Sequence, residues 1–245
     1  MACPRLGYLI SLQAKIREVM DLNELKNRLE GKTIEENMAL LADLFPEKVI
    51  FTTSFGIEDQ VITRKIFANN LNIKVATIDT GRLFSETYEV FYHSLLQFGK
   101  TIHTYFPDYQ AVEQLITEKG PFSFFGSTEE RKECCRIRKD VPLERALEGM
   151  QVWISGIRAE QSEERRQMQQ LEYDEHRKLY KYYPLFNWTY QEVRQYVKEK
   201  YIPYNALHDK RYTSIGCQPC TRAIEPGENF LAGRWWWENE GCKDC

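Results

Sequence analysis

Six of the seven cysteines in this 245-residue chain come in close pairs, and grouped thiols are a strong pointer to chemistry. The three pairs are Cys134–Cys135, Cys217–Cys220 and Cys242–Cys245, and Cys3 stands apart from them. Clustered cysteines in a chain that lacks the marks of a short secreted protein are typical of metal ligands or redox groups, not of a disulfide framework. We therefore expect metal or thiol chemistry.

Two different sets of four thiols would satisfy a metal site. Cys134, Cys135, Cys217 and Cys220 suit an iron–sulfur cluster, because adjacent cysteine side chains diverge and fit around a large cubane more easily than around one ion. The alternative joins the Cys217–Cys220 pair to the third pair, separated from it by 21 residues, which approaches a zinc-ribbon spacing. That alternative leaves the adjacent pair as small buried hydrophobes, and a third reading makes the thiols inert.

Three short polar turns each follow a segment rich in strand-forming residues. They are Ser54-Phe55-Gly56, Asp79-Thr80-Gly81 and Gly156-Ile157-Arg158. Free N–H groups in the Ser54 turn and the dipole of the following helix suit a phosphate or sulfate, although an ordinary strand–helix turn has the same composition. Asp79 would either hold a ribose hydroxyl or cap its own turn.

Segments typical of strands and helices alternate along the middle of the chain. We expect strands at 48–53, 73–78, 101–106 and 151–155, and helices at 58–69, from 85 onward and at 109–118. This alternation predicts an α/β fold with a parallel twisted sheet and helices on both faces. Ligands of such sheets bind beyond the carboxyl ends of the strands, where all three turns lie.

Capping signals and apolar periodicity locate several helices more closely. Thr33 with Glu36, and Thr189 with Glu192, have the spacing of a capping box, and we expect a helix after each. Ser85 is expected to cap a third helix. The apolar stripe of that helix recurs at helical spacing in Tyr88, Phe91, Tyr92, Leu95 and Leu96. Residues 158–177 are charged and are predicted to be irregular.

Composition excludes some classes of protein. The formal net charge of −3 argues against nucleic-acid binding by bulk charge. No apolar run approaches the length of a membrane-spanning helix. The first 20 residues make a poor signal peptide, because Lys15, Arg17 and Glu18 interrupt their apolar run. We therefore expect a cytoplasmic protein with no membrane or nucleic-acid partner.

Basic and aromatic residues accompany these motifs. Lys139, Arg158 and Arg234 lie beside the cysteines or a turn and suit an anionic ligand, although single basic residues more often solvate a surface. Three consecutive tryptophans, residues 235–237, cannot share one face of a regular element. At least one is expected to pack the loop-rich C-terminal part onto the domain.

Taken in order, these motifs resemble the assimilatory adenylyl-sulfate and phosphoadenylyl-sulfate reductases. The matching segments are Ser54-Phe55-Gly56, residues 79–83 (DTGRL), 132–139 (KECCRIRK), 156–162 (GIRAEQS), 217–222 (CQPCTR) and 233–238 (GRWWWE). Residues 243–245 (KDC) are similar to the Lys-Glu-Cys near the end of that family's sequences. The order and approximate spacing hold from about residue 48 onward.

The resemblance implies a fold related to the ATP pyrophosphatases (adenine nucleotide alpha hydrolase-like), with a loop-rich C-terminal arm. It implies a [4Fe–4S] cluster held by Cys134, Cys135, Cys217 and Cys220, and it makes Cys245 the catalytic nucleophile. The implied substrate-binding residues are Ser54, Phe55, Gly56, Asp79, Thr80, Gly81, Lys139, Gly156, Arg158 and Arg234. We therefore expect three parts, namely an N-terminal helical segment (1–45), an α/β sulfonucleotide-binding domain (46–200) and the loop-rich C-terminal arm (201–245).

The activity implied is reduction of adenylyl sulfate to sulfite and AMP through a cysteine S-sulfonate, in sulfate assimilation and cysteine biosynthesis. Thioredoxin or glutaredoxin would supply the electrons, and a homo-oligomer is possible. The nearest alternative is reduction of 3′-phosphoadenylyl sulfate. More remote alternatives are an ATP pyrophosphatase-type thiolation enzyme, whose loop differs here at Phe55 and Asp59, and a zinc-ribbon binding module.

Overall fold

The computed structural model describes residues 20–240, and the chain divides into two compact units, 1–32 and 33–245. In the first unit α2 (Leu22–Leu29) begins after Asp21, whose carboxylate accepts the backbone N–H groups of Asn23 and Glu24. All the elements below belong to the second unit. The division of residues 46–245 into a domain and an arm at 200 stays a prediction.

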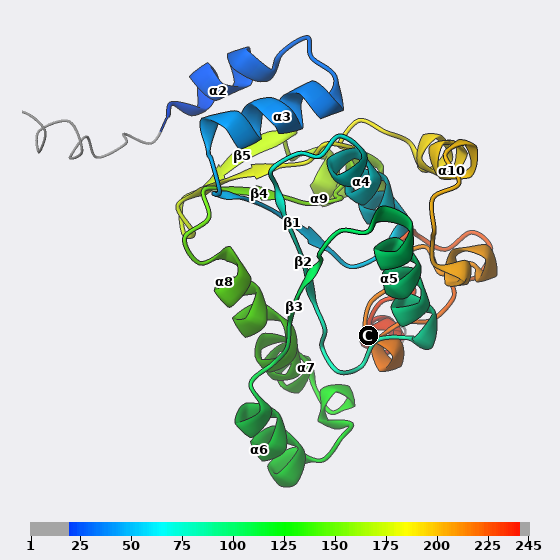
Figure 1. Cartoon of the computed structure of the whole chain (residues 1–245). Helices are drawn as coiled ribbons and strands as arrows, with labels where there is room; N and C mark the ends of the chain where they lie inside the picture. Colours follow the sequence, from blue (N-terminus) through cyan, green and yellow to red (C-terminus); the bar gives the residue numbers. More distant parts are fainter. Residues whose placement is uncertain (1–19, 241–245) are drawn as a thin grey trace, which may run out of the picture. The chain divides into compact units, whose positions relative to one another are not determined.

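A six-stranded sheet is the centre of the second unit (Figure 1). Its strands are β1 (Val49–Thr53), β2 (Lys74–Ile78), β3 (His103–Tyr105), β4 (Val152–Ile154), β5 (Leu171–Asp174) and β6 (Leu179–Tyr182). The order is β3-β2-β1-β4-β6-β5, and every neighbouring pair is parallel except β5 with β6. The predicted parallel sheet is thus confirmed, with one antiparallel strand at its edge.

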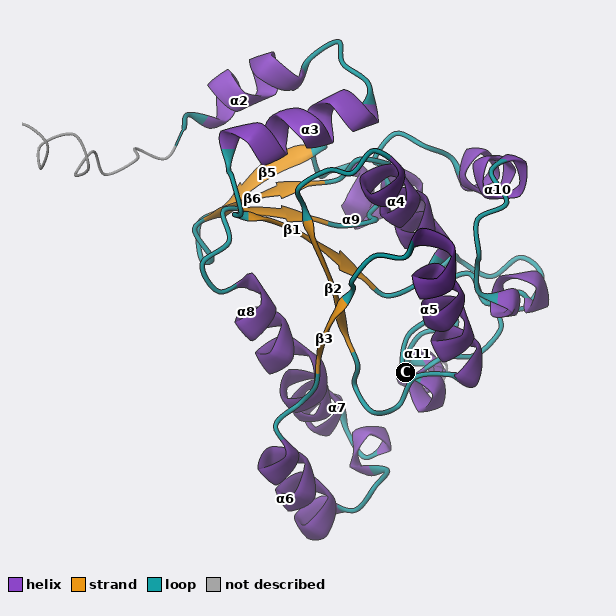
Figure 2. Ribbon diagram, viewed as in Figure 1, coloured by secondary structure: helices purple, strands orange, loops and turns teal. Residues whose placement is uncertain are grey.

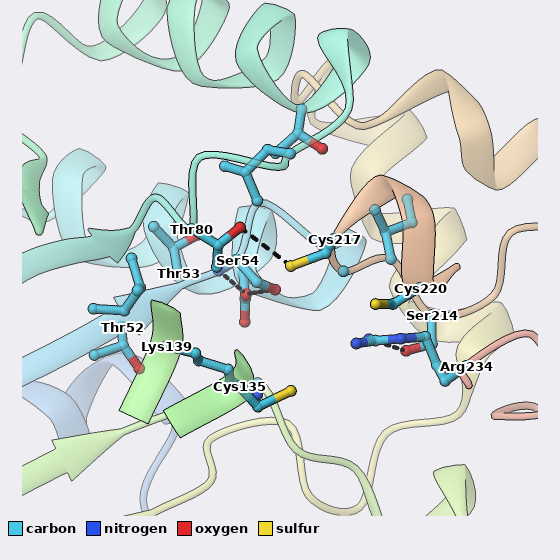
Figure 3. A pocket seen from close by; sticks show the side chains of 18 of the residues that line it. Thr52, Thr53, Ser54, Thr80, Cys135, Lys139, Ser214, Cys217, Cys220 and Arg234 are labelled. Carbon is cyan, nitrogen blue, oxygen red and sulfur yellow. Dashed lines mark hydrogen bonds between the residues drawn. The ribbon is translucent and has the colours of Figure 1, made fainter. Parts of the chain in front are cut away.

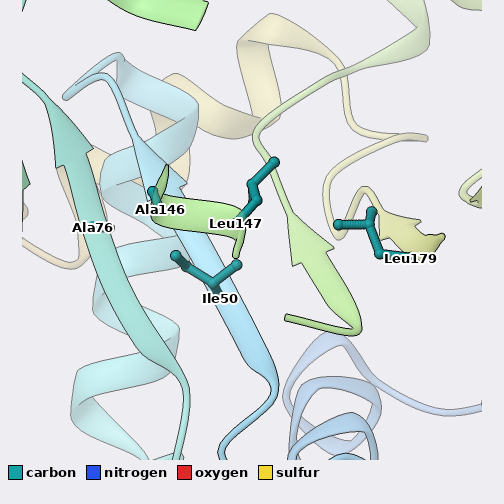
Figure 4. Close-up of a cluster of buried hydrophobic side chains, with 5 residues drawn as sticks. All are labelled: Ile50, Ala76, Ala146, Leu147 and Leu179. Atoms are coloured by element: carbon teal, nitrogen blue, oxygen red, sulfur yellow. The ribbon is translucent and has the colours of Figure 1, made fainter. Parts of the chain in front are cut away.

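Helices cover both faces of this sheet (Figure 2). Helix α8 (Val141–Leu147) packs Ala146 and Leu147 against Ile50 of β1 and Ala76 of β2 (Figure 4). Because side chains alternate along a strand, Phe51 turns to the opposite face, where α4 (Ile57–Ala68) and α5 (Ser85–Phe98) lie. These continuous apolar strands are typical of a sheet buried on both sides.

Both predicted capping boxes are present. Thr33 and Glu36 cap α3 (Ile34–Leu44), and Thr189 and Glu192 cap α10 (Tyr190–Glu199), with each hydroxyl accepting a backbone N–H while the glutamate reaches back to the cap. The remaining α-helices are α6 (Tyr109–Lys119), α7 (Thr128–Cys135), α9 (Glu163–Arg166) and α11 (Trp236–Glu240). Within residues 20–240, no helix is both long and apolar enough to cross a membrane.

The predicted N-cap of α5 was wrong. Phe84 occupies the cap position and Ser85 is already helical, where its hydroxyl bonds Glu86 instead of a backbone N–H. A helix usually packs onto its domain through its apolar stripe, but this helix does not. The buried residues of α5 are Thr87, Val90 and Ser94, while most of the stripe is exposed.

The segment predicted to be irregular contains a hairpin. Residues 171–182 contain β5 and β6, which pair antiparallel in a register that runs from Leu171 opposite Tyr182 to Asp174 opposite Leu179. Their charges pair locally, since Asp174 accepts bonds from Lys181 and Arg177. These pairings lower the pKa of Asp174 below its usual range, against the opposing effect of burial.

Short helical pieces connect these elements around the site. They are the 3-10 turns η1 (Ser123–Phe125), η3 (Ala159–Gln161), η4 (Ala206–Lys210) and η5 (Gln218–Cys220), and the π-helical turn η2 (Arg136–Asp140). The π-helical turn follows the adjacent cysteines directly, and such turns frequently occur at functional sites.

Candidate functional site

A cavity of about 480 Å³ lies beyond the carboxyl ends of β1, β2 and β4 (Figure 3). The three turns predicted from the sequence contribute Ser54, Thr80 and Gly156 to its wall. The opposite wall comes from the C-terminal region, including residues 213–217 and Arg234. The cavity therefore combines the ligand-binding edge of the sheet with a segment remote in sequence.

Four cysteines meet on this wall. Cys134 and Cys135 end α7, while Cys217 caps the η5 turn and Cys220 is its last residue. Cys134 and Cys220 are buried, and the Sγ atom of Cys217 lies 3.1 Å from the Thr80 hydroxyl. The backbone N–H of Gln218 donates to the carbonyl of Arg82, which fixes the second pair against the loop after β2.

The arrangement of these thiols constrains what they can hold. In the described part of the chain, no three metal-binding side chains approach closely enough for a single ion. All four thiols nevertheless face one cavity and influence one another's charge. Thiols spread around a shared space fit a multi-atom metal cluster better than one zinc ion. The first of the two sets considered from the sequence lies wholly within the described residues, and its role as a set of cluster ligands stays a prediction.

Burial disfavours ionisation of these thiols. It raises the pKa of Cys134, Cys135 and Cys220, and that of Cys220 to about 12, with the neighbouring thiols adding to the effect. Four thiolates together would need compensating positive charge, because like charges close together raise each other's pKa. A bound metal supplies that charge, and metal binding requires the thiolate form.

Several arginines around the cysteines add positive charge. Arg138 is buried, and its Nη1 donates to the Thr80 carbonyl at 2.8 Å. Arg138 and Arg82 both oppose the rise in the pKa of Cys134. Arg131 has its guanidinium 4.5 Å from the Trp235 ring and pairs with Glu238. Positive charge thus surrounds the thiols from α7, the β2 loop and the C-terminal region.

Arg234 lies flat over Gly216. A Cβ atom at Gly216 would come within 2.3 Å of Nη2 and 2.5 Å of Cζ, so only glycine allows the guanidinium this position. The Arg234 guanidinium is also 5.0 Å from the Trp235 ring and its charge interacts with Cys217. Burial lowers the pKa of Arg234, opposed by the thiols. This geometry aims a fixed cation at the cavity.

The Ser54 turn already holds a carboxylate. Asp59 Oδ2 accepts the Ser54 backbone N–H at 2.6 Å and the Ser54 hydroxyl at 2.8 Å. Its other oxygen lies against Gly156, where a Cβ atom would come within 2.3 Å. Burial, the largest cause, raises the pKa of Asp59 to about 6, despite the two bonds from Ser54. The donors predicted to bind an anion are therefore engaged by an internal one.

The rest of this turn is shaped by its backbone. Phe55 has φ of +59°, a left-handed conformation uncommon outside glycine, and its ring stacks on Phe91 at 4.8 Å. Its side chain is buried away from the cavity. Gly56 is the N-cap of α4, and the Ile57 N–H donates to Nε2 of His208, whose pKa burial lowers. A neutral imidazole therefore accepts at the helix N-terminus.

Some of the predicted site residues line the cavity, and others lie behind its wall. Those on the wall are Ser54, Gly56, Thr80, Lys139, Gly156, Arg234, Cys134, Cys135, Cys217 and Cys220. Those off the wall are Phe55, Asp79, Gly81 and Arg158. The roles of these residues toward a ligand stay predictions, but the contacts of the second group are clear.

Asp79 and Arg158 both form hydrogen bonds or ion pairs with other residues of the protein. Asp79 accepts the Gly81 N–H and the Tyr88 hydroxyl, which corresponds to the capping alternative. Arg158 is fully buried, and it pairs with Glu58 at 2.9 Å and Glu160 at 2.6 Å. The pair with Glu58 fastens the β4 loop to the start of α4.

Several wall residues were missed from the sequence. Arg165 lies on the wall in the segment predicted to be irregular, and no pattern marked it. Arg131 precedes Cys135 by four residues on α7, a spacing that places both on one helical face and could have revealed it. Asp59 was noted only as a departure from another loop type, although it is a main feature of the turn.

Aromatic packing holds the last described helix in place. Trp237 contacts Phe124 and Phe125, with ring centroids 6.0 and 4.5 Å apart, and Trp236 lies 4.9 Å from Trp237. The prediction that a tryptophan packs the C-terminal region onto the domain is confirmed. Since α11 follows Arg234 and Trp235 directly, this packing also fixes the cationic wall of the cavity.

Residues 48–223 match the sequence profile of the phosphoadenosine phosphosulfate reductase domain. The chain belongs to this family. A protein of Sinorhizobium fredii (strain NBRC 101917 / NGR234) named adenosine 5′-phosphosulfate reductase is 45% identical, over 90% of this chain and 88% of its own length. A protein of the same name from Agrobacterium fabrum is 42% identical, over 92% of this chain and 86% of its own length. Another, from Allochromatium vinosum, is 43% identical, over 81% of this chain and 78% of its own length.

Solved structures agree with this family and define its fold. Phosphoadenylyl-sulfate reductase from Candida auris, in a phosphate complex, superimposes with a TM-score of 0.71 at 25% identity, covering 83% of this chain and 96% of that one. Yeast FAD synthetase in complex with FAD gives a TM-score of 0.51 at 12% identity, over 82% and 73%. This reductase-family chain therefore has the predicted nucleotide alpha hydrolase-like fold.

The predicted nucleophile of this reductase-family chain, Cys245, lies outside the described residues, as do Cys242 and Cys3. Glu240, the last described residue, is five positions before Cys245.

Proposed function

We propose that this protein reduces adenylyl sulfate to sulfite and AMP, with electrons from a thioredoxin-type dithiol protein and with Cys245 as the nucleophile. The proposal rests on one observation. Four cysteines and several basic residues line the same cavity as the turns at the carboxyl ends of the strands, where ligands of such sheets bind. The naming of the relatives as adenosine 5′-phosphosulfate reductases supports the choice of substrate.

The four wall thiols would hold a [4Fe–4S] cluster. Their number, thiol chemistry and shared cavity fit it, and no three of the described metal-binding side chains are placed for one ion. When bound, such a cluster would supply a cationic core that offsets part of the charge of the four thiolates, and a rigid metal–sulfur framework. The chain's own contribution is to hold Cys217 beside Thr80 and to surround the thiols with arginines.

The reaction itself is a two-stage sulfur transfer. The Cys245 thiolate attacks the sulfur of the sulfate group, the bond from that sulfur to the phosphate oxygen breaks, and AMP leaves with the electron pair. The product is an S-sulfonate on Cys245. A thiolate of the dithiol protein then attacks the Cys245 sulfur and releases sulfite, and its second thiol resolves the mixed disulfide. The dithiol loses two electrons, and the sulfur atom that leaves as sulfite gains them.

Residues of the wall would bind and orient the substrate. Lys139, Arg165 and Arg234 provide cations for phosphate and sulfate oxygens, which become more negative as AMP departs. Ser54 provides a hydroxyl and an N–H, and Asp59 must share or release them when an anion arrives. A protonated Asp59 would donate a hydrogen bond where a carboxylate would repel the anion.

The proposal is tested by adduct mapping under anaerobic conditions. The full chain is incubated with adenylyl sulfate but no dithiol protein, and the cysteine peptides are analysed by mass spectrometry. A sulfonate on Cys245 that reduced thioredoxin removes as sulfite supports the proposal. The Cys245→Ser variant should form no adduct, while Cys242→Ser should form it normally. An adduct on another cysteine, or none in the cluster-loaded protein, contradicts it.

A second substrate is favoured by one observation. The solved structure with a TM-score of 0.71 is named for phosphoadenylyl sulfate, and the wall carries six lysine and arginine residues that could accommodate a further phosphate: Arg82, Arg131, Arg138, Lys139, Arg165 and Arg234. The same assay with 3′-phosphoadenylyl sulfate compares the rates of adduct formation. Faster reaction of adenylyl sulfate supports the first proposal, and faster reaction of the 3′-phosphorylated compound reverses the preference.

A further inference from the structure

The side chain of Gln161 connects a buried ion pair to the wall of the cavity. Gln161 is the last residue of η3, its side chain is buried, and it also lines the cavity. Its amide oxygen accepts the backbone N–H of Arg158 at 3.1 Å and a further bond from Nη1 of Arg165. Its amide nitrogen donates to Oε1 of Glu58, also at 3.1 Å. One side chain therefore joins the start of α4, the β4 loop and α9.

The partners of Gln161 fix the orientation of its amide group. The Glu58 carboxylate, which is paired with Arg158, only accepts hydrogen bonds. The Arg158 N–H and the Arg165 guanidinium only donate them. The nitrogen of the amide must therefore face Glu58, and the oxygen must face Arg165. A flipped amide would place donor against donor and acceptor against acceptor.

Buried charges support this amide from behind. Glu58 Oε1 also accepts a bond from Nε of Arg158 at 2.9 Å, and both side chains are buried. The Arg158 guanidinium lies 5.7 and 5.5 Å from the ring centroids of Tyr190 and Phe230. Hydrogen bonds between charged groups are stronger in a buried environment than in water. The base on which Gln161 rests is therefore rigid.

Arg165 is held at the cavity by a neutral acceptor. An amide oxygen orients a guanidinium without cancelling its charge, whereas a carboxylate would form an ion pair with it. Burial, the largest cause, lowers the pKa of Arg165, and the charge of Arg234 lowers it further, while the charge of Glu58 opposes both. Arg165 and Arg234 both line the cavity and repel each other. Two such cations favour an anion that binds near both.

We propose that Gln161 is a positioning residue, which holds the Arg165 guanidinium toward the phosphate of the bound nucleotide. This inference rests on the proposed function, because the phosphate is that of adenylyl sulfate or of its product AMP. Glu58 and Arg158 orient the amide, the amide places the guanidinium, and the guanidinium meets the anion. Arg158, which was expected beside the ligand, would then act on it through Gln161.

The test is calorimetric binding of AMP and of adenosine to the full chain. Gln161→Met keeps the length of the side chain but removes the amide, and it should raise the dissociation constant of AMP by about 10-fold. Adenosine has no phosphate, so its constant should change by less than about 2-fold. Gln161→Asn, whose shorter amide cannot reach Glu58 and Arg165 together, is the second variant and should give the same pattern.

The matched control is Gln167→Met, because Gln167 is exposed at the end of α9. This variant should bind both ligands as the wild type does, and circular dichroism verifies that every variant is folded. A general disturbance of the cavity would weaken AMP and adenosine alike. Equal weakening of the two ligands by both Gln161 variants therefore overturns the proposal, and so does unchanged binding of AMP.

A double-mutant cycle shows whether Gln161 acts through Arg165. Arg165→Met alone should raise the dissociation constant of AMP by at least about 10-fold, and adding Gln161→Met should then change it by less than about 2-fold. Additive losses would mean that Gln161 binds the nucleotide itself, which also overturns the proposal. Calorimetry involves no sulfur transfer, so the absence of a sulfonate on Cys245 would contradict the proposed reaction without altering these outcomes. A wild-type chain that does not bind AMP would refute both.

Discussion

Replacing Asp59 by asparagine tests the account of the Ser54 turn most directly. Asparagine keeps the shape and an oxygen that can accept the Ser54 N–H and hydroxyl, but it removes the titratable charge. If the turn is shaped by hydrogen bonding and the charge is an energetic cost, Asp59→Asn will fold and will be more stable than the wild type at neutral pH.

The size of the effect follows from the pKa of Asp59. Its rise from 3.8 to about 6 corresponds to about 3 kcal/mol, at about 1.4 kcal/mol for each pH unit. The folded protein binds the Asp59 proton more tightly than the unfolded chain does. The contribution of this proton to the free energy of unfolding is therefore complete below pH 3.8 and is lost as pH rises through 6. The full cost of the buried charge is therefore present above pH 6.

Urea unfolding of both proteins between pH 4 and pH 8 measures this difference. We expect Asp59→Asn to be about 2–3 kcal/mol more stable at pH 8 and equal to the wild type near pH 4. The control, Asp140→Asn, removes an exposed carboxylate from the same cavity and should change the free energy of unfolding by less than about 0.5 kcal/mol. A pH-independent difference between Asp59→Asn and the wild type would refute the reasoning.

Three further outcomes are expected. Arg158→Met leaves the buried Glu58 carboxylate without its cation and should lower the free energy of unfolding, measured in urea, by about 3–5 kcal/mol. Gly216→Ala must displace the Arg234 guanidinium, and it should raise the KM for adenylyl sulfate at least about 10-fold with little change in melting temperature. Cys220→Ser should abolish stoichiometric iron binding while thermal unfolding stays cooperative, as measured by metal analysis and calorimetry.

The parts of the fold that sequence predicted well are those fixed by local chemistry. Both capping boxes start helices, because a hydroxyl and a glutamate three residues apart satisfy backbone groups wherever the helix lies. The strand-forming segments gave β1 to β4, since buried parallel strands are apolar on both faces. The turns after these strands came to one cavity for a topological reason, namely that parallel strands end at the same edge.

The parts that were missed depend on distant contacts. The β5–β6 hairpin resembles a charged loop in sequence, because Asp174 pairs with Lys181 on the other strand and with Arg177 in the turn. The periodicity of α5 revealed an apolar stripe, but it did not reveal that most of this stripe is exposed to solvent. Arg158 was expected beside a ligand, and its burial between Glu58 and Glu160 depends on residues up to 100 positions away.

The separation of the four cysteines along the chain has a consequence for how the protein is made. Cys217 meets Thr80 across 137 positions, and its neighbour Gln218 bonds the loop after β2, so the second cysteine pair reaches its place only when the sheet is complete. Such contacts form late in folding, because long loops must close first. Loading of the proposed cluster is therefore expected to follow chain synthesis, and an unfolding protein is expected to release such a cluster in the same step.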